Sequence, residues 1–473
     1  MRALQTFRQR FLDFRASALG RFLQFAFIIF VAVLIAQQSA PALGEPVAYM
    51  LGILVAAALL WASETIPLFA TSLLIIGAQI LFLGNPGNWA MLQIPGNEPI
   101  PYRNFLAPIS DPIIVLFLGG FILAKVGVKV NVDQYVSSLV LRVFGFSAGR
   151  VLLGVMVSTM VFGMWISNTA TTAMMITLTG TFLGSVPVGN PFRKALTLGI
   201  PFAAGIGGLM TPISSPPNAI AIGLLAQEGV RVDFLTWMVI MTPLVLALFL
   251  LTYFLIWYRY RPAMPLQLPP IEIKPFPKSG YFVMLVFTIT VLLWLTDSTH
   301  GVPAAVVALF PVIMFTATGF LNAKEFNSLE WNILFVIAGG LALGQGMSLT
   351  GLDKVIAGML PLESNWIVLI TFALTMLLGT FMSNTTTAIL FIPMAISLAQ
   401  LLPDVNMKFM AIGLAVMASS SMALPISTPP NAIAYATGEV TTSDFATTGI
   451  FLGVCTLFLT YGYFWLLSYF GLW

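Results

Sequence analysis

Residues 165 to 175 read WISNTATTAMM, and residues 381 to 391, 216 positions later, read FMSNTTTAILF. Each stretch places the same Ser-Asn-Thr cluster near the middle of a long apolar segment. Polar groups at membrane depth are tolerated only where protein or a water-filled cavity satisfies them. The doubled cluster therefore predicts a polar site inside an otherwise apolar protein.

The composition is that of a polytopic membrane protein. Hydrophobic residues make up 59% of the 473 positions, charged residues 8%, and the mean hydropathy is +0.97. In a soluble domain about a quarter of the residues are charged. A membrane protein has fewer, because an unpaired charge in hydrocarbon is costly. The net charge of +3 gives no indication of a nucleic-acid partner. Cys455 is the only cysteine, which excludes an intramolecular disulfide and a cysteine-metal cluster.

Apolar runs of roughly 20 residues, the length that crosses a bilayer, predict eleven transmembrane helices. They lie at 22–40, 46–62, 65–84, 112–131, 193–226, 234–257, 280–296, 302–320, 331–350, 406–437 and 446–470. The segments that carry the two clusters, 150–186 and 364–402, are predicted to be re-entrant hairpins. The predicted fold class is thus an all-α polytopic membrane protein.

Loop charges predict the orientation. With the N-terminus inside, sixteen of the twenty Lys and Arg residues fall on the cytoplasmic side, where short loops collect positive charge. The four exceptions are Arg103, Arg231, Lys354 and Lys408. The N-terminus is therefore expected in the cytoplasm and the C-terminus outside, in the inner membrane of a bacterium. Cleavage of the first apolar run as a signal peptide, near residue 39, is the less favoured alternative.

The two halves of the chain match each other in order. FLGGFILAKVGV (117 to 128) corresponds to VIAGGLALGQGM (336 to 347), the two SNT clusters correspond, and TPISSPPNAIAIG (211 to 223) corresponds to LPISTPPNAIAYATG (424 to 438). The predicted domains are residues 1–45 with the first helix, a repeat at 46–257, a Pro-rich cytoplasmic linker at 258–280 and a repeat at 281–473. An odd number of crossings in each repeat inverts the second, a pattern typical of secondary transporters.

The residue types at the breaks indicate what the site binds. Ser167 or Asn168 is expected to start the second helix of its hairpin, because Ser and Asn are favourable N-caps. Pro216 and Pro429 each follow an unwound stretch and fit the first turn of a half-helix. Four half-helix N-termini would converge and attract an anion. Because no motif contains Lys, Arg or His, bound Na+ is predicted to supply the missing charge, held by carbonyl, Ser and Asn oxygens.

At these residues the chain resembles the divalent-anion:sodium symporter family of dicarboxylate, citrate and sulfate transporters. The resemblance covers about residues 46 to 470 and implies a homodimer with an elevator-type movement. It implies contacts between the substrate carboxylates and Asn168, Thr169, Ser215, Asn384, Thr385 and Thr428. For sodium it points to Ser167, Asn168 and Ser214, and to Met382, Asn384 and Ser427. The implied function is symport of a C4-dicarboxylate such as succinate or malate with Na+, with no organic cofactor and with membrane lipid as surroundings.

Two departures from the family pattern keep alternatives open. Some sodium-coupled members carry Ser or Thr where this chain has Gly163 and Gly379, so these positions can offer sodium only backbone carbonyls. Ser214 and Ser427 stand where Gly or Ala is frequent. A sodium-independent exchanger, or a sulfate or citrate transporter, is therefore the alternative. An intramembrane hydrolase is disfavoured because the single histidine, His300, lies in a loop and no nucleophile motif is present, and paired hairpins favour a carrier over a channel.

Overall fold

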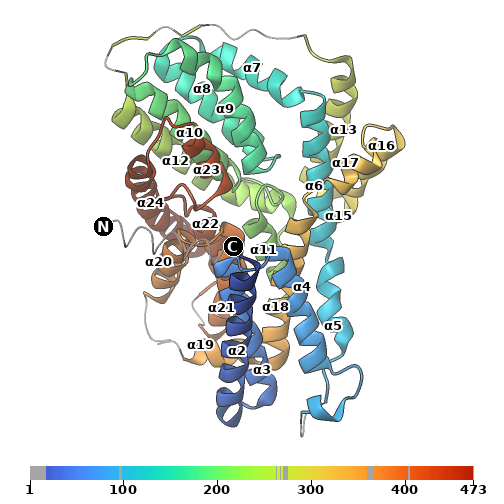
Figure 1. The fold of residues 1–473 in the computed structure, drawn as a ribbon. Helices are drawn as coiled ribbons and strands as arrows, with labels where there is room; N and C mark the ends of the chain where they lie inside the picture. Colours follow the sequence, from blue (N-terminus) through green and yellow to red (C-terminus); the bar gives the residue numbers. More distant parts are fainter. Residues whose placement is uncertain are drawn as a thin grey trace. The chain divides into compact units, whose positions relative to one another are not determined.

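The computed structural model describes residues 17–94, 98–262, 264–266, 268–269, 275–359, 366–402 and 405–471. Outside these ranges lie residues 1–16 of the predicted cytoplasmic N-terminus, seven linker positions (263, 267 and 270–274), the predicted start of the second hairpin at 364–365, and the C-terminal residues 472–473. The described chain is helical, and no strand occurs in it (Figure 1). This confirms the predicted all-α class.

Eight helices in the described ranges are long and apolar enough to cross a membrane. They are Ala18–Leu43, Glu45–Ser63, Tyr102–Lys129, Phe234–Tyr260, Lys278–Leu295, Trp331–Thr350, Asn384–Leu401 and Thr442–Tyr469. Shorter apolar helices follow at Leu68–Gly84, Ala148–Gly163, Ala304–Ala317, Ile367–Gly379 and Met407–Ser419. Broken and paired short helices explain why fewer long spans occur than the apolar runs of the sequence suggest.

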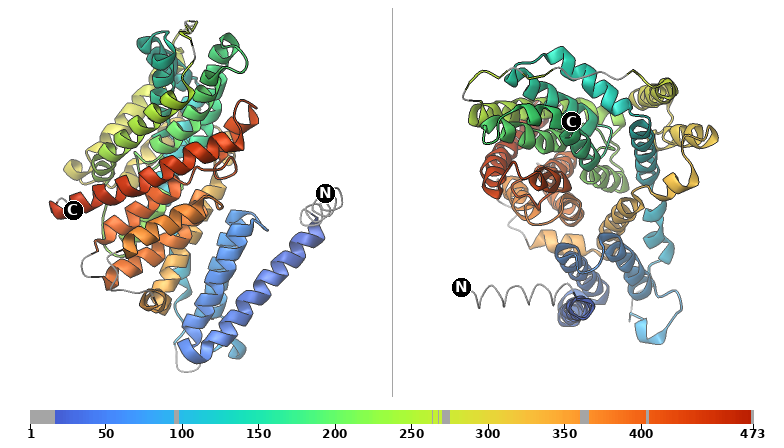
Figure 2. Two further views of the ribbon diagram at one scale, coloured as in Figure 1. Left: turned by 90° about the vertical axis from the view of Figure 1, so that its left-hand side faces the viewer. Right: turned by 45° about the horizontal axis from the view of Figure 1, so that its top comes forward.

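The chain divides into two compact units, and the first contains Met1–Asp111, Asn332–Leu362 and Gln400–Leu402. Its helices are α2 (Ala18–Leu43), α3 (Glu45–Ser63), α4 (Leu68–Gln79), α5 (Tyr102–Leu106), α18 (Trp331–Thr350) and α19 (Leu352–Gly358), with short η1 (Ile80–Gly84), η2 (Ala90–Leu92) and η3 (Ala107–Ser110). The blue helices α2 and α3 run side by side (Figure 2). The buried Gln79 joins α4 to α18, because its Nε2 donates to the Ala342 carbonyl at 2.9 Å.

The second unit contains Pro112–Trp331, Glu363–Ala399 and Pro403–Trp473. From the first half of the chain come α6 (Pro112–Lys129), α7 (Val132–Phe144), α8 (Ala148–Gly163), α9 (Asn168–Ser185), α10 (Pro191–Gly207), α11 (Pro216–Gln227) and α12 (Phe234–Tyr260). The second half adds α13 (Lys278–Leu295), α14 (Asp297–His300), α15 (Ala304–Val307), α16 (Leu309–Ala317), α17 (Ala323–Asn327), α20 (Ile367–Gly379), α21 (Asn384–Leu401), α22 (Met407–Ser419), α23 (Pro429–Ala436) and α24 (Thr442–Tyr469).

The same order of elements occurs in both halves within this unit. A helix pair joined at an SNT cluster, α8–α9 or α20–α21, precedes a helix interrupted before a Pro-Pro pair, α10–α11 or α22–α23, and a long helix, α12 or α24, follows. Helix α24 lies beside α12 and α22 (Figure 1). All the residues predicted for the substrate and sodium sites therefore belong to one compact unit.

Ion pairs hold the start of α10 against the loop before α24 and against the first turn of α24. The Arg193 guanidinium pairs with Glu439 and also donates to the Leu183 and Val186 carbonyls at the end of α9. The Lys194 ammonium lies 2.9 Å from a carboxylate oxygen of Asp444. These contacts join an element of the first half of the sequence to an element of the second half. They lie at the opposite end of α10 from its break.

Candidate functional site

Each hairpin turns at its SNT cluster, and the serine caps the second helix. Ser167 has non-helical backbone dihedrals, and its Oγ accepts from the Ala170 amide at 3.4 Å, so that α9 begins at Asn168. In the second hairpin, Ser383 Oγ accepts from the Thr386 amide at 3.2 Å, and α21 begins at Asn384. The structure thus assigns the cap to the serine, one of the two residues that the sequence offered.

Each broken helix restarts at its first proline. Helix α10 ends at Gly207 and α11 begins at Pro216, while α22 ends at Ser419 and α23 begins at Pro429. Proline fits this first helical position because the amide hydrogen it lacks has no intrahelical acceptor there. Thr428 Oγ1 accepts from an amide of α23, whereas Ser215 makes no corresponding cap.

The asparagine after each Pro-Pro pair supports the unwound backbone. Asn218 Nδ2 donates to the Gly208 and Thr211 carbonyls at 2.9 and 2.8 Å. Asn431 Nδ2 donates to the Met422 and Leu424 carbonyls at 3.0 Å each. Both side chains are fully buried. The Pro-Pro-Asn motif therefore stops one half-helix, starts the next and satisfies the carbonyls between them.

A hydroxyl from each break reaches the hairpin of the same half. Thr211 Oγ1 donates to the Met164 carbonyl at 2.6 Å, and Ser427 Oγ donates to the Thr380 carbonyl at 2.8 Å. Met164 and Thr380 are the first residues after α8 and α20, so corresponding carbonyls are bound. The hydroxyls come from different positions of the two breaks, which is a departure from the repeat.

The SNT asparagines lie against the breaks. A Cβ placed on Gly208 would lie 2.6 Å from Asn168 Nδ2, so the Asn168 amide contacts the first residue of its break. Asn384 Nδ2 donates to the Ser419 carbonyl at the end of α22, at 3.3 Å. Ser215 Oγ lies 3.5 Å from Ser419 Oγ, and this pair joins the two breaks. The structure brings the hairpin tips and breaks into two adjoining polar clusters.

The remaining predicted residues are placed less specifically. Ser214 is buried, and its hydroxyl donates within its own break to the Gly208 and Thr211 carbonyls. Thr169, Met382 and Thr385 are half-buried at the hairpin tips, and no side-chain hydrogen bond of theirs is found in the described chain. They are therefore available to a ligand.

Close packing explains the glycines at 163 and 379. A Cβ on Gly163 would lie 2.9 Å from the Ala204 carbonyl oxygen, and one on Gly379 would lie 2.5 Å from Ser421 Oγ. A Ser or Thr at either position would force apart the hairpin and its neighbouring helix. At the second site, the Ser421 hydroxyl occupies the space that a side chain at 379 would need.

Five buried carboxamide oxygens have no hydrogen-bond partner among the described residues. One is Oε1 of Gln79 in the first unit, and the other four belong to the motif asparagines. These four are Oδ1 of Asn168, Asn218, Asn384 and Asn431. Buried polar atoms are nearly always satisfied, so an unpaired one requires an explanation such as a bound ion or water. No group of three or more His, Cys, Asp or Glu side chains suitable for a metal occurs in the described residues. Neutral oxygens of this kind fit a hard monovalent cation better than a transition metal.

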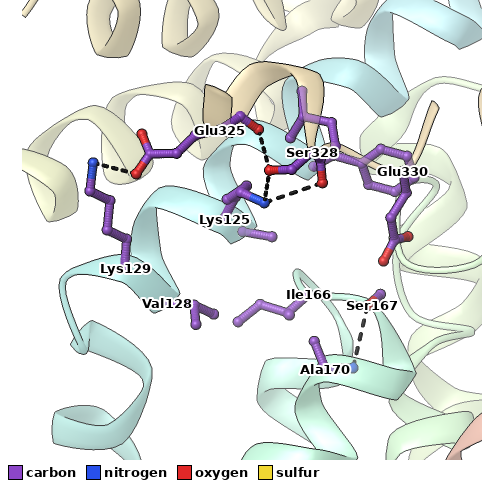
Figure 3. A pocket seen from close by; sticks show the side chains of 12 residues that line it. Lys125, Val128, Lys129, Ile166, Ser167, Ala170, Glu325, Ser328 and Glu330 are labelled. Carbon is purple, nitrogen blue, oxygen red and sulfur yellow. Dashed lines mark hydrogen bonds and ion pairs between the residues drawn. The ribbon is translucent and has the colours of Figure 1, made fainter. Parts of the chain in front are cut away.

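Charged side chains occur beside the first hairpin tip, in a cavity of about 370 Å³ (Figure 3). Its lining includes Ser167, Lys125, Lys129, Glu325 and Glu330. Lys129 pairs with Glu325 at 2.7 Å and holds the pKa of that carboxyl below its ordinary value. Burial raises the pKa of Glu330. Lys125 Nζ donates to Ser328 Oγ at 2.7 Å and belongs to no ion pair of the described residues.

The sequence-based predictions missed several residues of the site. Thr211, Ser419 and Ser421 were not assigned, although the run of three serines at 419–421 interrupts an apolar helix and is visible in the sequence. Lys125 was counted only as a cytoplasmic loop charge. Its place beside Ser167 depends on how α6 packs on the hairpin, which the sequence does not specify.

An all-helical membrane protein with paired hairpins, paired helix breaks and a polar site between them is a secondary transporter. A family model described as citrate transporter matches residues 58–374 and 291–470, and the chain belongs to this family. The family relationship confirms the resemblance found in the sequence and makes the chain a transport protein rather than an enzyme.

Among curated relatives, the chain is 30% identical over 427 residues to the inorganic phosphate transporter PHO87 of Saccharomyces cerevisiae, covering 86% of this chain and 46% of that protein. An uncharacterized transporter of Schizosaccharomyces pombe is also 30% identical, over 80% of this chain and 44% of its own length. The chain thus spans about half the length of these two relatives. The sodium-dependent dicarboxylate transporter SdcS of Staphylococcus saprophyticus is 29% identical, covering 84% of this chain and 81% of SdcS.

Two solved transporters share the fold. The YdaH transporter of Alcanivorax borkumensis aligns with a TM-score of 0.53 at 15% identity, over 85% of this chain and 98% of that chain. MtrF of Neisseria gonorrhoeae aligns with a TM-score of 0.50 at 12% identity, over 86% and 96%. At these identities the likeness concerns the fold alone.

Proposed function

We propose that this transporter carries a divalent organic anion, a C4-dicarboxylate such as succinate or malate, together with Na+. The observation that carries the proposal is the set of four buried, unpaired Oδ1 atoms of Asn168, Asn218, Asn384 and Asn431. They form two equivalent pairs, one in each half, in a site whose motifs contain no charged side chain. Sodium bound at these oxygens supplies the positive charge that a dianion needs in the membrane. The sodium-dependent relative SdcS supports this assignment.

Substrate and cation share the same residues in this proposal. Sodium binding adds further groups to the four Oδ1 atoms of Asn168, Asn218, Asn384 and Asn431. These groups are Ser167 and Ser214 in the first half, Met382 and Ser427 in the second, and the backbone of Gly163 and Gly379. The carboxylates bind to the amides and hydroxyls of Asn168, Thr169, Ser215, Asn384, Thr385 and Thr428. The half-helix N-termini of α9, α11, α21 and α23 add partial positive charge.

The mode of action proposed with this site is an elevator-type movement within a homodimer in the inner membrane of a bacterium. The N-terminus lies in the cytoplasm and the C-terminus outside. The second candidate is a sodium-independent anion exchanger. The Lys125 ammonium favours it, because it lies in the cavity that borders Ser167 and forms no ion pair in the described chain. A lysine there could neutralise part of the anion's charge without sodium.

Uptake into liposomes tests both candidates. Purified protein is reconstituted and supplied with labelled succinate, citrate, sulfate or phosphate, with an inward gradient of Na+ or of choline. The proposal predicts saturable succinate uptake that requires Na+. Uptake indifferent to Na+, with external succinate driving efflux of internal succinate, would establish the exchanger instead. Transport of sulfate, citrate or phosphate without succinate would contradict the assigned substrate class.

A further inference from the structure

A second cavity, of about 730 Å³, lies where the end of α12 meets the first turn of α8. Its lining includes Ser147, Gly149, Arg150, Tyr253, Trp257 and Arg261. Its volume falls within the range of small-molecule and cofactor sites. The proposed substrate and sodium residues do not line it.

Arg150 and Arg261 both line the cavity and give it positive charge. Among the described residues, its lining contains no Asp or Glu. Neither arginine forms an ion pair within the described residues, and Arg150 uses only Nε, which donates to Ser147 Oγ at 2.9 Å. The planar guanidinium presents parallel N–H donors that match the oxygens of a phosphate group.

The first turn of α8 adds unpaired amides to the same wall. Ser147 is the N-cap of this 16-residue helix, yet its side chain accepts from Arg150 rather than from an amide. Within the described residues, the first amides of the helix consequently have no side-chain cap, and they carry partial positive charge. Two aromatic side chains fix the turn in place. Tyr253 donates to the Gly149 carbonyl at 3.2 Å, and a Cβ on Gly149 would lie 3.2 Å from the Trp257 indole.

The cavity lies at the depth of the lipid headgroups. Helix α12 is a 27-residue apolar span, and its end carries Trp257, Tyr260 and Arg261. Aromatic and basic residues gather at the interface between membrane and water. One turn or more before this end, Leu250 and Phe254 expose 49% and 61% of their surface, as lipid-facing side chains do. By the predicted orientation this is the cytoplasmic end, where anionic lipids attract basic residues.

We infer that this cavity binds the phosphate-bearing headgroup of an anionic phospholipid. Arg150 and Arg261 bind the phosphate oxygens, and the Trp257 and Tyr253 rings face the glycerol region. The acyl chains lie along the exposed face of α12. Because α8 leads directly to the hairpin tip at Ser167, the bound lipid holds the base of that hairpin at the membrane surface.

The test measures lipid binding by the full-length protein. Purified protein is titrated in detergent with fluorescent phosphatidylglycerol and, separately, with fluorescent phosphatidylcholine, and retained lipid is counted by native mass spectrometry. The Arg150→Gln/Arg261→Gln variant should bind phosphatidylglycerol about thirtyfold more weakly, with phosphatidylcholine binding unchanged. Arg142→Gln, a control at an exposed arginine of α7 outside the cavity, should leave both affinities unchanged.

Conservative lysine variants and competition by inorganic phosphate complete the test. Arg150→Lys and Arg261→Lys preserve charge and folding but lose the paired donors, so each should weaken phosphatidylglycerol binding severalfold. Equal binding by the double glutamine variant and the unaltered protein would overturn the site. Displacement of phosphatidylglycerol by inorganic phosphate at equal concentration would show that the cavity binds a soluble anion rather than lipid.

Discussion

Replacing the asparagine of each Pro-Pro-Asn motif by alanine should destabilise the two halves to different extents. Each substitution removes two buried hydrogen bonds, worth about 1 kcal/mol apiece. In the first half, both carbonyls keep another donor. Ser214 Oγ lies 2.7 and 2.8 Å from the Gly208 and Thr211 carbonyls, which share its single hydrogen, and the Ser214 amide also donates to Thr211 O at 3.4 Å. Asn218→Ala should therefore lower the free energy of unfolding by about 2 kcal/mol.

In the second half, one of the two carbonyls has no other donor. Leu424 O still accepts from the Ser427 amide at 3.1 Å, but Met422 O has only Asn431 as a donor among the described residues. Leaving a buried carbonyl without a partner costs a further 1 to 3 kcal/mol, roughly. Asn431→Ala should therefore cost about 4 kcal/mol, clearly more than the equivalent change in the first half.

Denaturant unfolding of the purified protein in detergent, followed by tryptophan fluorescence, measures both values. Ser214→Ala supplies the matched control. Combined with Asn218→Ala it should cost more than the sum of the two single changes, because the Gly208 carbonyl then loses its last partner. Equal losses at positions 218 and 431, or an additive double variant, would refute the assignment of these asparagines as supports for the unwound backbone.

Three other perturbations have defined outcomes. The Arg193 guanidinium lowers the pKa of Glu439 below its ordinary value of 4.5. This carboxylate therefore stabilises the folded protein above that value, and the contribution is lost as the pH falls through the lowered pKa. Glu439→Gln should flatten the decline in melting temperature below about pH 5, and an unchanged decline would contradict the pairing. Gly379→Ser should lower the free energy of unfolding by about 1 to 3 kcal/mol through overpacking, and Ser421→Ala in the same chain should restore part of it. If Ser421→Ala restored nothing, the close approach of Gly379 to Ser421 would not be the cause of the loss. A cysteine at Ser279, in a background without other cysteines, should react with a membrane-impermeant reagent only from the cytoplasm, and labelling from outside would reverse the predicted orientation.

The sequence predicted those features that follow from local chemistry. Serine capping at Ser167 and the restart of helices at Pro216 and Pro429 depend on residues close together in the chain, so a short motif suffices to recognise them. The apolar runs likewise predicted seven of the eight long apolar helices, since the hydrocarbon thickness sets their length. The eighth, Asn384–Leu401, is the second arm of a predicted hairpin.

Other features depend on contacts between distant segments. Lys125 lies beside Ser328, 203 positions away, and its role near the hairpin is invisible in the local sequence. Ser427 reaches the Thr380 carbonyl, whereas the equivalent carbonyl in the first half is reached by Thr211, so repeat symmetry alone gives the wrong donor. Helix α7 was not expected because its 13 residues are amphipathic and too short to span.

The reciprocity of sodium and substrate binding tests the central claim most directly. Calorimetric titration of purified protein with succinate, at increasing NaCl and with choline chloride at constant ionic strength, gives the substrate dissociation constant at each sodium concentration. If Na+ at the asparagine oxygens compensates the dianion, raising sodium should tighten succinate binding with a coupling of roughly 1 to 3 kcal/mol. Ser167→Ala should reduce this sodium effect more than it weakens binding at saturating sodium. A dissociation constant that stays the same in sodium and choline would contradict the account. The half-helix N-termini and Lys125 would then be the groups that compensate the charge of the anion.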